Sequence, residues 1–137
     1  MPAVQAMLSS HPHPPAAVEL LSRCVEACFT CAETCNACAD ACLGEPEAPH
    51  LIACIRLNLD CATICTATGT ILARSNADNI DRTMVQAQIA ACMVASRACA
   101  EECARHGEMH HHCRICAEAC ALCEQACADI LRTVKIS

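Results

Sequence analysis

The sequence predicts an all-α protein, an antiparallel up-down-up-down four-helix bundle with a cysteine-lined core. Three observations support this fold. First, the composition suits helices, since 55% of the 137 residues are hydrophobic but only 1% are aromatic and only 3 are glycine. Second, four long segments show helical periodicity. Third, short connections separate these segments, and helices joined in this way pack as antiparallel neighbours.

The predicted elements follow from proline and glycine signals. Residues 1–13 form a lead-in, flexible or with a short helical turn, and residues 14–137 form the bundle domain. Pro14 and Pro15 suit a first helical turn, and Gly44 suits a C-terminal stop. The four predicted helices span about residues 16–43, 47–74, 79–106 and 108–133.

The later connections carry similar signals. Pro46 or Pro49 opens the second predicted helix, and Gly107 ends the third. Polar residues that commonly cap helices lie between the second and third helices. These capping candidates are Ser75, Asn76 and Asp78.

The first predicted helix carries a ladder of six cysteines between residues 24 and 42, with successive separations of 4, 3, 4, 3 and 4. At 100° per residue their thiols fall within an arc of about 80° and climb about 27 Å. The other helices repeat this stripe more sparsely, and the bundle axis is the place where four stripes can be buried together. We therefore expect one core to hold all 17 cysteines: Cys24, Cys28, Cys31, Cys35, Cys38, Cys42, Cys54, Cys61, Cys65, Cys92, Cys99, Cys103, Cys113, Cys116, Cys120, Cys123 and Cys127.

Charge and cysteine usage narrow the classes of function. The net charge of −6 argues against nucleic acid and acidic membrane surfaces as partners. No apolar run approaches the length of a membrane span. The N-terminal stretch lacks the basic and apolar regions of an export signal, so we expect a cytoplasmic protein with reduced thiols. An odd number of cysteines, 17, also excludes full disulfide pairing within one chain.

The antiparallel order predicts two different ends for this core. One end gathers possible metal ligands: Cys42, His50, Cys54, Cys103, His106, Met109 and Cys113. The other end gathers an aliphatic plug: Leu20, Leu72, Val85 and Leu131. Within the histidine run, His112 projects nearest the cysteine stripe, His110 projects further from it and His111 projects towards solvent.

Packing and zinc are poor explanations for four matched stripes. Free cysteine packs as a small hydrophobe, but alanine or valine would pack as well without the risk of oxidation. A zinc ion held by four thiolates carries a net charge of −2. Four such sites would bury a charge of about −8 in an apolar core, at a severe cost in desolvation.

Cu(I) suits the ladder better, because it is a soft ion that prefers thiolate ligands. If each sulfur bridges two ions and each ion contacts two sulfurs, copper and thiolate occur in equal numbers. The loaded core is then neutral, which avoids burial of net charge. The 17 thiolates would hold roughly as many Cu(I) ions.

These features resemble the bacterial copper storage proteins, specifically their cytosolic branch without an export signal. The resemblance lies in the four thiol-lined stripes and in the histidines and methionine at one end, and it covers about residues 16–134. It implies a non-enzymatic store of many Cu(I) ions, assembly into a homotetramer, and copper uptake at the histidine end. Asn58, Thr68 and Ser96 stand where a fuller ladder would have sulfur, so cluster details are expected to differ between members.

Several other residues are candidates for metal uptake or auxiliary ligation: His50, Asn58, His106, Met109, His110 and His112. Asn58 lies on the buried stripe as either a satisfied core amide or an oxygen ligand to a copper cluster, and the sequence leaves both open. Phe29, the single aromatic residue, lies off the stripe and is expected at a helix–helix or subunit contact.

Two other functions remain open on the sequence alone. A general thiolate buffer would bind zinc or other soft metals in detoxification. A thiol redox or electron-transfer protein would use the same cysteines. No nucleotide-binding loop, substrate pocket or His-Cys-Asp constellation is identifiable, so we do not expect an enzyme.

Overall fold

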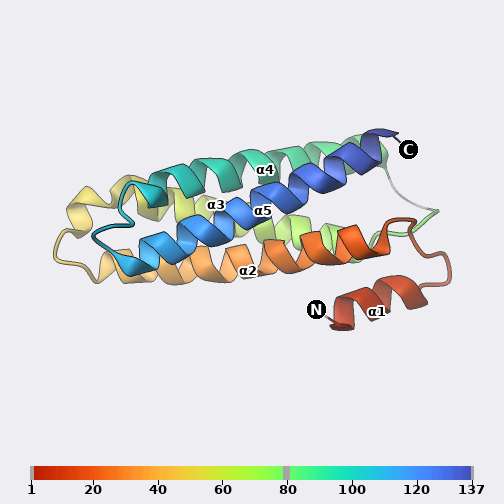
Figure 1. The fold of residues 1–137 in the computed structure, drawn as a ribbon, viewed down its shortest axis with the longest axis horizontal. Coiled ribbons are helices and arrows are strands. Elements are labelled where there is room, and N and C mark those ends of the chain that lie inside the picture. The colour runs from red at the N-terminus through yellow and green to blue at the C-terminus, as the bar shows by residue number, and fades with distance from the viewer. Residues whose placement is uncertain (1, 79–80, 137) are drawn as a thin grey trace.

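The computed structural model describes residues 2–78 and 81–136, and every regular element in these ranges is helical. A short helix α1 (Pro2–Ser10) precedes α2 (Val18–Leu43), the 3₁₀ turn η1 (Ala48–His50), α3 (Ile52–Ala73), α4 (Arg82–Ala104) and α5 (His111–Ile136). Figure 1 shows the four long helices lying lengthwise side by side, with α1 next to α2. The predicted all-α four-helix bundle is confirmed. Within the described ranges, no helix is long and apolar enough to cross a membrane.

The boundaries of α2 agree closely with the prediction. The helix begins at Val18 rather than near residue 16, because the chain still turns at Ala16 and Ala17 after the two prolines. It ends at Leu43 as predicted, and the N–H of Gly44 donates to carbonyls of the last turn. Gly44 has φ −83° in the right-handed region, so the helix does not end by the left-handed conformation that glycine favours.

The start of α3 is later than predicted. After Gly44 the chain first makes the 3₁₀ turn η1, which contains Pro49, and α3 begins only at Ile52. Proline fixes its own φ and lacks an N–H, so it fits this isolated turn without opening the longer helix. The expected start near residue 47 was therefore wrong by about one helical turn.

The capping prediction ahead of α4 was also wrong. Asp81 is the N-cap, and its Oδ1 accepts a hydrogen bond from the Met84 N–H at 3.0 Å. Asn76 instead forms a local turn in which its Oδ1 accepts from the Asp78 N–H at 2.9 Å. Residue 79, the predicted first residue of this helix, lies outside the described residues.

The connection between α4 and α5 is wider than predicted. Here α4 ends at Ala104 and α5 begins only at His111, while residues 105–109 form successive turns. The N–H of His110, directly after these turns, donates to the His106 carbonyl at 2.9 Å. This connection carries several of the candidate histidines, so its geometry determines which of them reach the core.

Two smaller packing features complete the fold. Leu8 of α1 is only 1% exposed, so α1 contributes to the core. The division into a lead-in at 1–13 and a bundle domain at 14–137 stays a prediction.

Phe29 lies between α2 and α3, where a Cβ on Gly69 would come within 3.1 Å of its ring. The helix contact expected for Phe29 is confirmed.

Candidate metal centre

All 17 cysteines lie in the core as free thiols, and none is more than 2% exposed. They come from α2, α3, α4 and α5, so every long helix contributes to one buried sulfur-lined interior. The convergence predicted from the four stripes is confirmed. A thiol every turn on a long helix produces this interior, because positions three and four apart share a face.

Neighbouring sulfurs lie between 3.5 and 4.0 Å apart, within helices and across them. Cys120 of α5 is 3.5 Å from both Cys31 and Cys35 of α2. Between α3 and α4, Cys54 and Cys103 are also 3.5 Å apart. These contacts join thiols from all four helices, so a soft ion placed between any two sulfurs has further sulfurs close by.

Several sets of ligand atoms converge within 4.8 Å of one another. They overlap, since Cys31, Cys35, Cys120 and Cys123 each belong to two sets. Overlapping sets cannot act as separate tetrahedral zinc sites, but they suit ions that share bridging sulfurs. Five of the sets found among the described residues are Cys28, Cys92, Cys123 and Cys127; Cys31, Cys35, Cys61 and Cys120; Cys35, Cys99, Cys116 and Cys120; Cys38, Cys42, His112 and Cys113; and Cys31, Cys65 and Cys123.

Burial and hydrogen bonds shift the pKa values of the core thiols in both directions. Burial raises the pKa of Cys42 to about 11 and also raises the pKa of Cys113. Hydrogen bonds with Cys127 and then Cys28 lower the pKa of Cys24. Because the core without metal holds protons, each ion that takes thiolate ligands must displace them.

Asn58 is fully buried among these sulfurs. Its Oδ1 accepts hydrogen bonds from Cys116 at 3.0 Å and from Cys99 at 3.1 Å. Cys103 donates to the same oxygen at 3.5 Å, and the Asn58 Nδ2 donates to Cys54 at 3.6 Å. The amide is thus both satisfied as a core group and aimed at a set of potential ligands, so the geometry fits both roles considered for it.

Two hydroxyls also interrupt the ladder. The Ser96 Oγ lies 3.8 Å from Cys65 and 4.0 Å from Cys61. The Thr68 hydroxyl donates to the Ile64 carbonyl at 2.7 Å and accepts from Gln88 at 2.9 Å. Thr68 therefore belongs to a local hydrogen-bonded pair, whereas Ser96 faces sulfur directly.

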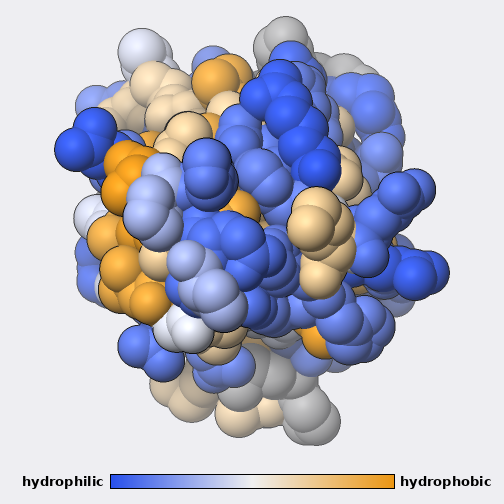
Figure 2. Space-filling view, turned by 90° about the vertical axis from the view of Figure 1, so that its left-hand side faces the viewer, coloured by the Kyte–Doolittle hydropathy of each residue, from blue (hydrophilic) through white to orange (hydrophobic). Residues whose placement is uncertain are grey.

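A cluster that we call the mouth closes one end of the core. It consists of Cys38, Cys42, Glu45, His110, His112 and Cys113. The His112 Nδ1 lies 3.5 Å from the Cys38 sulfur and 3.6 Å from the Cys113 sulfur. Its Nε2 is 2.9 Å from the Glu45 carboxylate. Figure 2 shows this end of the molecule as mainly hydrophilic, with hydrophobic residues gathered towards one side.

Charge at the mouth follows from these contacts. Burial lowers the pKa of His112, but hydrogen bonds with Cys38 and Glu45 outweigh it and the pKa is raised. The hydrogen bond from His112 correspondingly lowers the pKa of Glu45. An imidazole that touches both sulfur and carboxylate thus links the buried thiols to the surface.

The remaining predicted residues at this end lie further out. His106 contacts Glu102 at 3.0 Å, Met109 is 77% exposed, and His50 and His111 are exposed. His110 is only 8% exposed, but the partners of its ring are carboxylates, Glu45 and Glu47. The structure brings His112 into a set with the thiols of Cys38, Cys42 and Cys113.

Comparison with known proteins identifies the family. Residues 17–132 match the family described as Csp, copper storage protein. The chain belongs to the copper storage protein family. Its structure is similar to that of the copper storage protein Ccsp from Streptomyces lividans loaded with 10 copper equivalents. The TM-score is 0.90 and the identity 46%, over 94% of this chain and 98% of that one.

Two further relatives support this assignment. The Cu(I)-bound copper storage protein BsCsp3 matches with a TM-score of 0.71 and 33% identity, over 81% of this chain and 97% of that one. The uncharacterized cysteine-rich protein YhjQ of Bacillus subtilis (strain 168) is 38% identical over 107 residues, which cover 78% of this chain and 92% of that protein.

The opposite end of this copper storage family member is aliphatic, but its residues differ in part from the prediction. Leu72 and Val85 are buried there as expected. Leu21 and Ile130 line this end, whereas their neighbours Leu20 and Leu131 are only partly buried. Small deviations from 100° per residue accumulate along a helix, so the inward position shifted by one residue.

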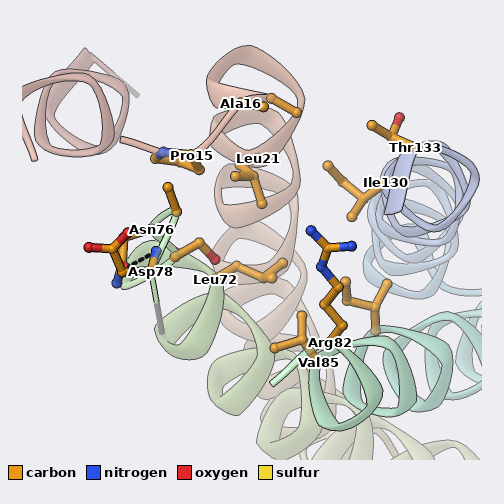
Figure 3. A pocket seen from close by; sticks show the side chains of 14 residues that line it. Pro15, Ala16, Leu21, Leu72, Asn76, Asp78, Arg82, Val85, Ile130 and Thr133 are labelled. Atoms are coloured by element: carbon orange, nitrogen blue, oxygen red, sulfur yellow. Dashed lines mark hydrogen bonds between the residues drawn. The ribbon is translucent and has the colours of Figure 1, made fainter. Parts of the chain in front are cut away.

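A cavity of about 420 Å³ lies outside this plug. Figure 3 shows Leu21, Leu72 and Ile130 on its walls, with Arg82 reaching into it from the start of α4. The plug therefore separates the thiol core from this cavity. At the mouth, by contrast, the imidazole of His112 contacts the thiols directly.

Sequence reasoning missed three acidic residues: Glu45, Glu47 and Glu102. Each of them contacts a candidate histidine. The sequence held one usable signal, because Glu45 and Glu47 lie in the connection after α2, at the end where the histidines were expected. Acidic residues in a proline-containing connection are usually solvated, so the sequence alone does not mark them as partners of the histidines.

Proposed function

We propose that this chain stores Cu(I) in its buried thiol core, in the cytoplasm, without catalysing a reaction. The observation that carries this proposal is the continuous set of buried free thiols at 3.5 to 4.0 Å spacing. Thiolate is the ligand that Cu(I) prefers. The family and its copper-loaded members support the same function.

All 17 cysteines are proposed as ligands, with roughly one Cu(I) ion for each. Overlap between the ligand sets supports bridging, because Cys35 and Cys120 each serve two sets. A bridged core with equal numbers of Cu⁺ and thiolate stays neutral and avoids a large cost in desolvation.

We propose His112 and Asn58 as auxiliary ligands. Support for His112 comes from its Nδ1, which lies 3.5 Å from Cys38. Support for Asn58 comes from the carbonyl oxygen that faces Cys99 and Cys116. The remaining candidates, which lie further from the thiols, are proposed to assist copper uptake: His50, His106, Met109 and His110.

The arrangement of the helices and the assembly are also proposed. The sulfur of Cys24 lies 3.9 Å from that of Cys127, so the start of α2 lies beside the end of α5. The sulfur of Cys42 lies 3.8 Å from that of Cys113, so the end of α2 lies beside the start of α5. These pairs support an antiparallel up-down-up-down order. A homotetramer follows from the family resemblance, and exposed apolar side chains such as Val94 (58%) and Leu122 (70%) leave surface for subunit contacts.

Titration of the reduced protein with Cu(I) against a chromogenic Cu(I) chelator tests the storage proposal. We expect saturation at roughly one ion per cysteine. The variant Cys35→Ser/Cys120→Ser keeps side-chain size and removes two shared sulfurs, and it should bind about two ions fewer. Saturation of the parent at a few ions, or a preference for four zinc ions, would instead favour a general thiolate buffer.

A further inference from the structure

Glu45 lies in the turn after α2, where one of its carboxylate oxygens faces two histidines. Its Oε2 is 2.9 Å from the His112 Nε2 and 3.2 Å from the His110 Nδ1. His110 lies in the connection before α5 and His112 lies in the first turn of α5, and both are far from Glu45 in sequence. The carboxylate is 27% exposed, so it lies at the boundary between the thiol core and water.

The contact with Glu45 fixes which nitrogen of His112 carries hydrogen. An ionised carboxylate only accepts hydrogen bonds, so the His112 Nε2 must be the donor. In the neutral ring the lone pair is then on Nδ1. This Nδ1 faces sulfur, at 3.5 Å from Cys38 and 3.6 Å from Cys113, and it belongs to the ligand set of the mouth.

The neighbouring ring of His110 has a different environment. Its Nδ1 faces Glu45, its Nε2 lies 3.5 Å from Glu47, and the ring is only 8% exposed. It stacks on His112, with ring centroids 5.5 Å apart and an interplanar angle of 23°. His110 therefore contacts both the Glu45 carboxylate and the His112 ring, so the Glu45–His112 contact has a buried neighbour on one side.

We propose that Glu45 is a positioning residue for copper uptake, which holds the His112 ring with its Nδ1 lone pair directed at the first thiols of the core. This inference rests on the proposed storage of Cu(I). A carboxylate behind a ligating imidazole fixes its tautomer and orientation, and loss of such a partner typically costs about 10- to 100-fold in metal affinity or activity. Glu45 does not touch the ion and acts through His112.

The test combines the His112 tautomer in the reduced apo protein with the rate of early copper loading. At a pH where the His112 ring is neutral, nitrogen-15 NMR of the histidine side chains should show His112 as the Nε2–H tautomer in the parent. Glu45→Ala should give a mixture of tautomers and load its first ions about 10-fold more slowly. The number of ions at saturation should stay at the parent value. Glu45→Gln retains an oxygen that can accept from Nε2–H, so it should restore the tautomer and part of the rate.

A matched control is Glu118→Ala, because Glu118 forms an exposed pair with Arg114 on α5. It should load like the parent. Glu45→Ala should also add no further slowing to His112→Ala, since both changes act through one ring. Parent-like tautomer and rate in Glu45→Ala would overturn the inference, as would equal slowing by Glu118→Ala or additive effects in the double variant. Failure of the parent to bind roughly one ion per cysteine would instead overturn the storage proposal itself.

Discussion

Replacement of Asn58 separates its structural role from its role as a ligand. Asn58→Leu keeps a similar volume and removes the amide, while Asn58→Ala leaves a cavity in a fully buried position. The amide makes four contacts with thiols, at 3.0 to 3.6 Å. Thiols are weak donors, so each contact falls at the low end of the usual net value, about 0.5 kcal/mol.

The expected changes in the free energy of unfolding depend on the burial of residue 58 and on the partners that the thiols keep after the replacement. In Asn58→Leu, Cys99 and Cys116 retain sulfur partners at 3.9 Å and 4.0 Å, in Cys103 and Cys120. The lost contacts are also offset by removal of a buried polar group. We expect the free energy of unfolding of the apo protein to change by no more than about 1 kcal/mol for Leu, and to fall by about 2 to 3 kcal/mol for Ala.

The copper-loaded protein should respond differently from the apo protein. If the Asn58 oxygen is a ligand, Asn58→Leu should bind the parent number of ions but give up some of them at lower concentrations of a competing chelator. Urea unfolding of the apo protein and chelator competition on the loaded protein measure the two effects. A loss above about 3 kcal/mol in apo Asn58→Leu, with unchanged copper retention, would refute the reasoning and make Asn58 a structural amide.

Three further predictions concern the metal-free core and its two ends. The reduced apo protein should be folded and helical at pH 7, and a coil spectrum in circular dichroism would contradict this. The pKa of Cys42 is raised to about 11, so the contribution of this thiol to stability is complete below the pKa of a free thiol, about 8.5. This contribution is lost as the pH rises towards 11. Thermal melts between these two pH values should show the decline. Replacement of His106, Met109 and His112 by Ala should slow copper loading with nearly unchanged capacity, whereas Cys24→Ala/Cys127→Ala should lower capacity and leave the early rate intact. Fast loading of the first variant together with slow loading of the second would place copper uptake at the aliphatic end.

The thiol core could be predicted from the sequence because it depends on helical periodicity alone. Cysteines three and four residues apart share a helical face whatever the exact boundaries of the helix, so later starts for α3 and α5 left the stripes intact. The plug was predicted less accurately, since Leu21 rather than Leu20, and Ile130 rather than Leu131, lies at the inward position. Near a helix end, a small change in rotation is enough to exchange neighbouring residues.

The mouth could not be predicted in full because it depends on contacts between distant segments. Glu45 and His112 are separated by 67 positions and meet only when the connection after α2 packs beside the start of α5. The predicted position of His112 nearest the cysteine stripe agrees with its contacts to Cys38 and Cys113, whereas His110 lies before the first residue of α5, where helical rotation does not apply. Its carboxylate partner depends on the path of two connections, which periodicity does not describe.

A store of this kind must be stable both empty and full, and the composition of the core explains how one fold meets both demands. In the empty protein, neutral thiols pack as small hydrophobes, and within the described ranges every buried side-chain nitrogen and oxygen has a hydrogen-bond partner. At the proposed ratio of one Cu⁺ to each thiol, every ion would replace one proton, so the charge of the core would not change. We therefore expect helix formation and copper binding to be separable, so that ions can be added or removed without unfolding the bundle. Ligands that lie along continuous helices suit this behaviour better than ligands in loops that need metal to fold.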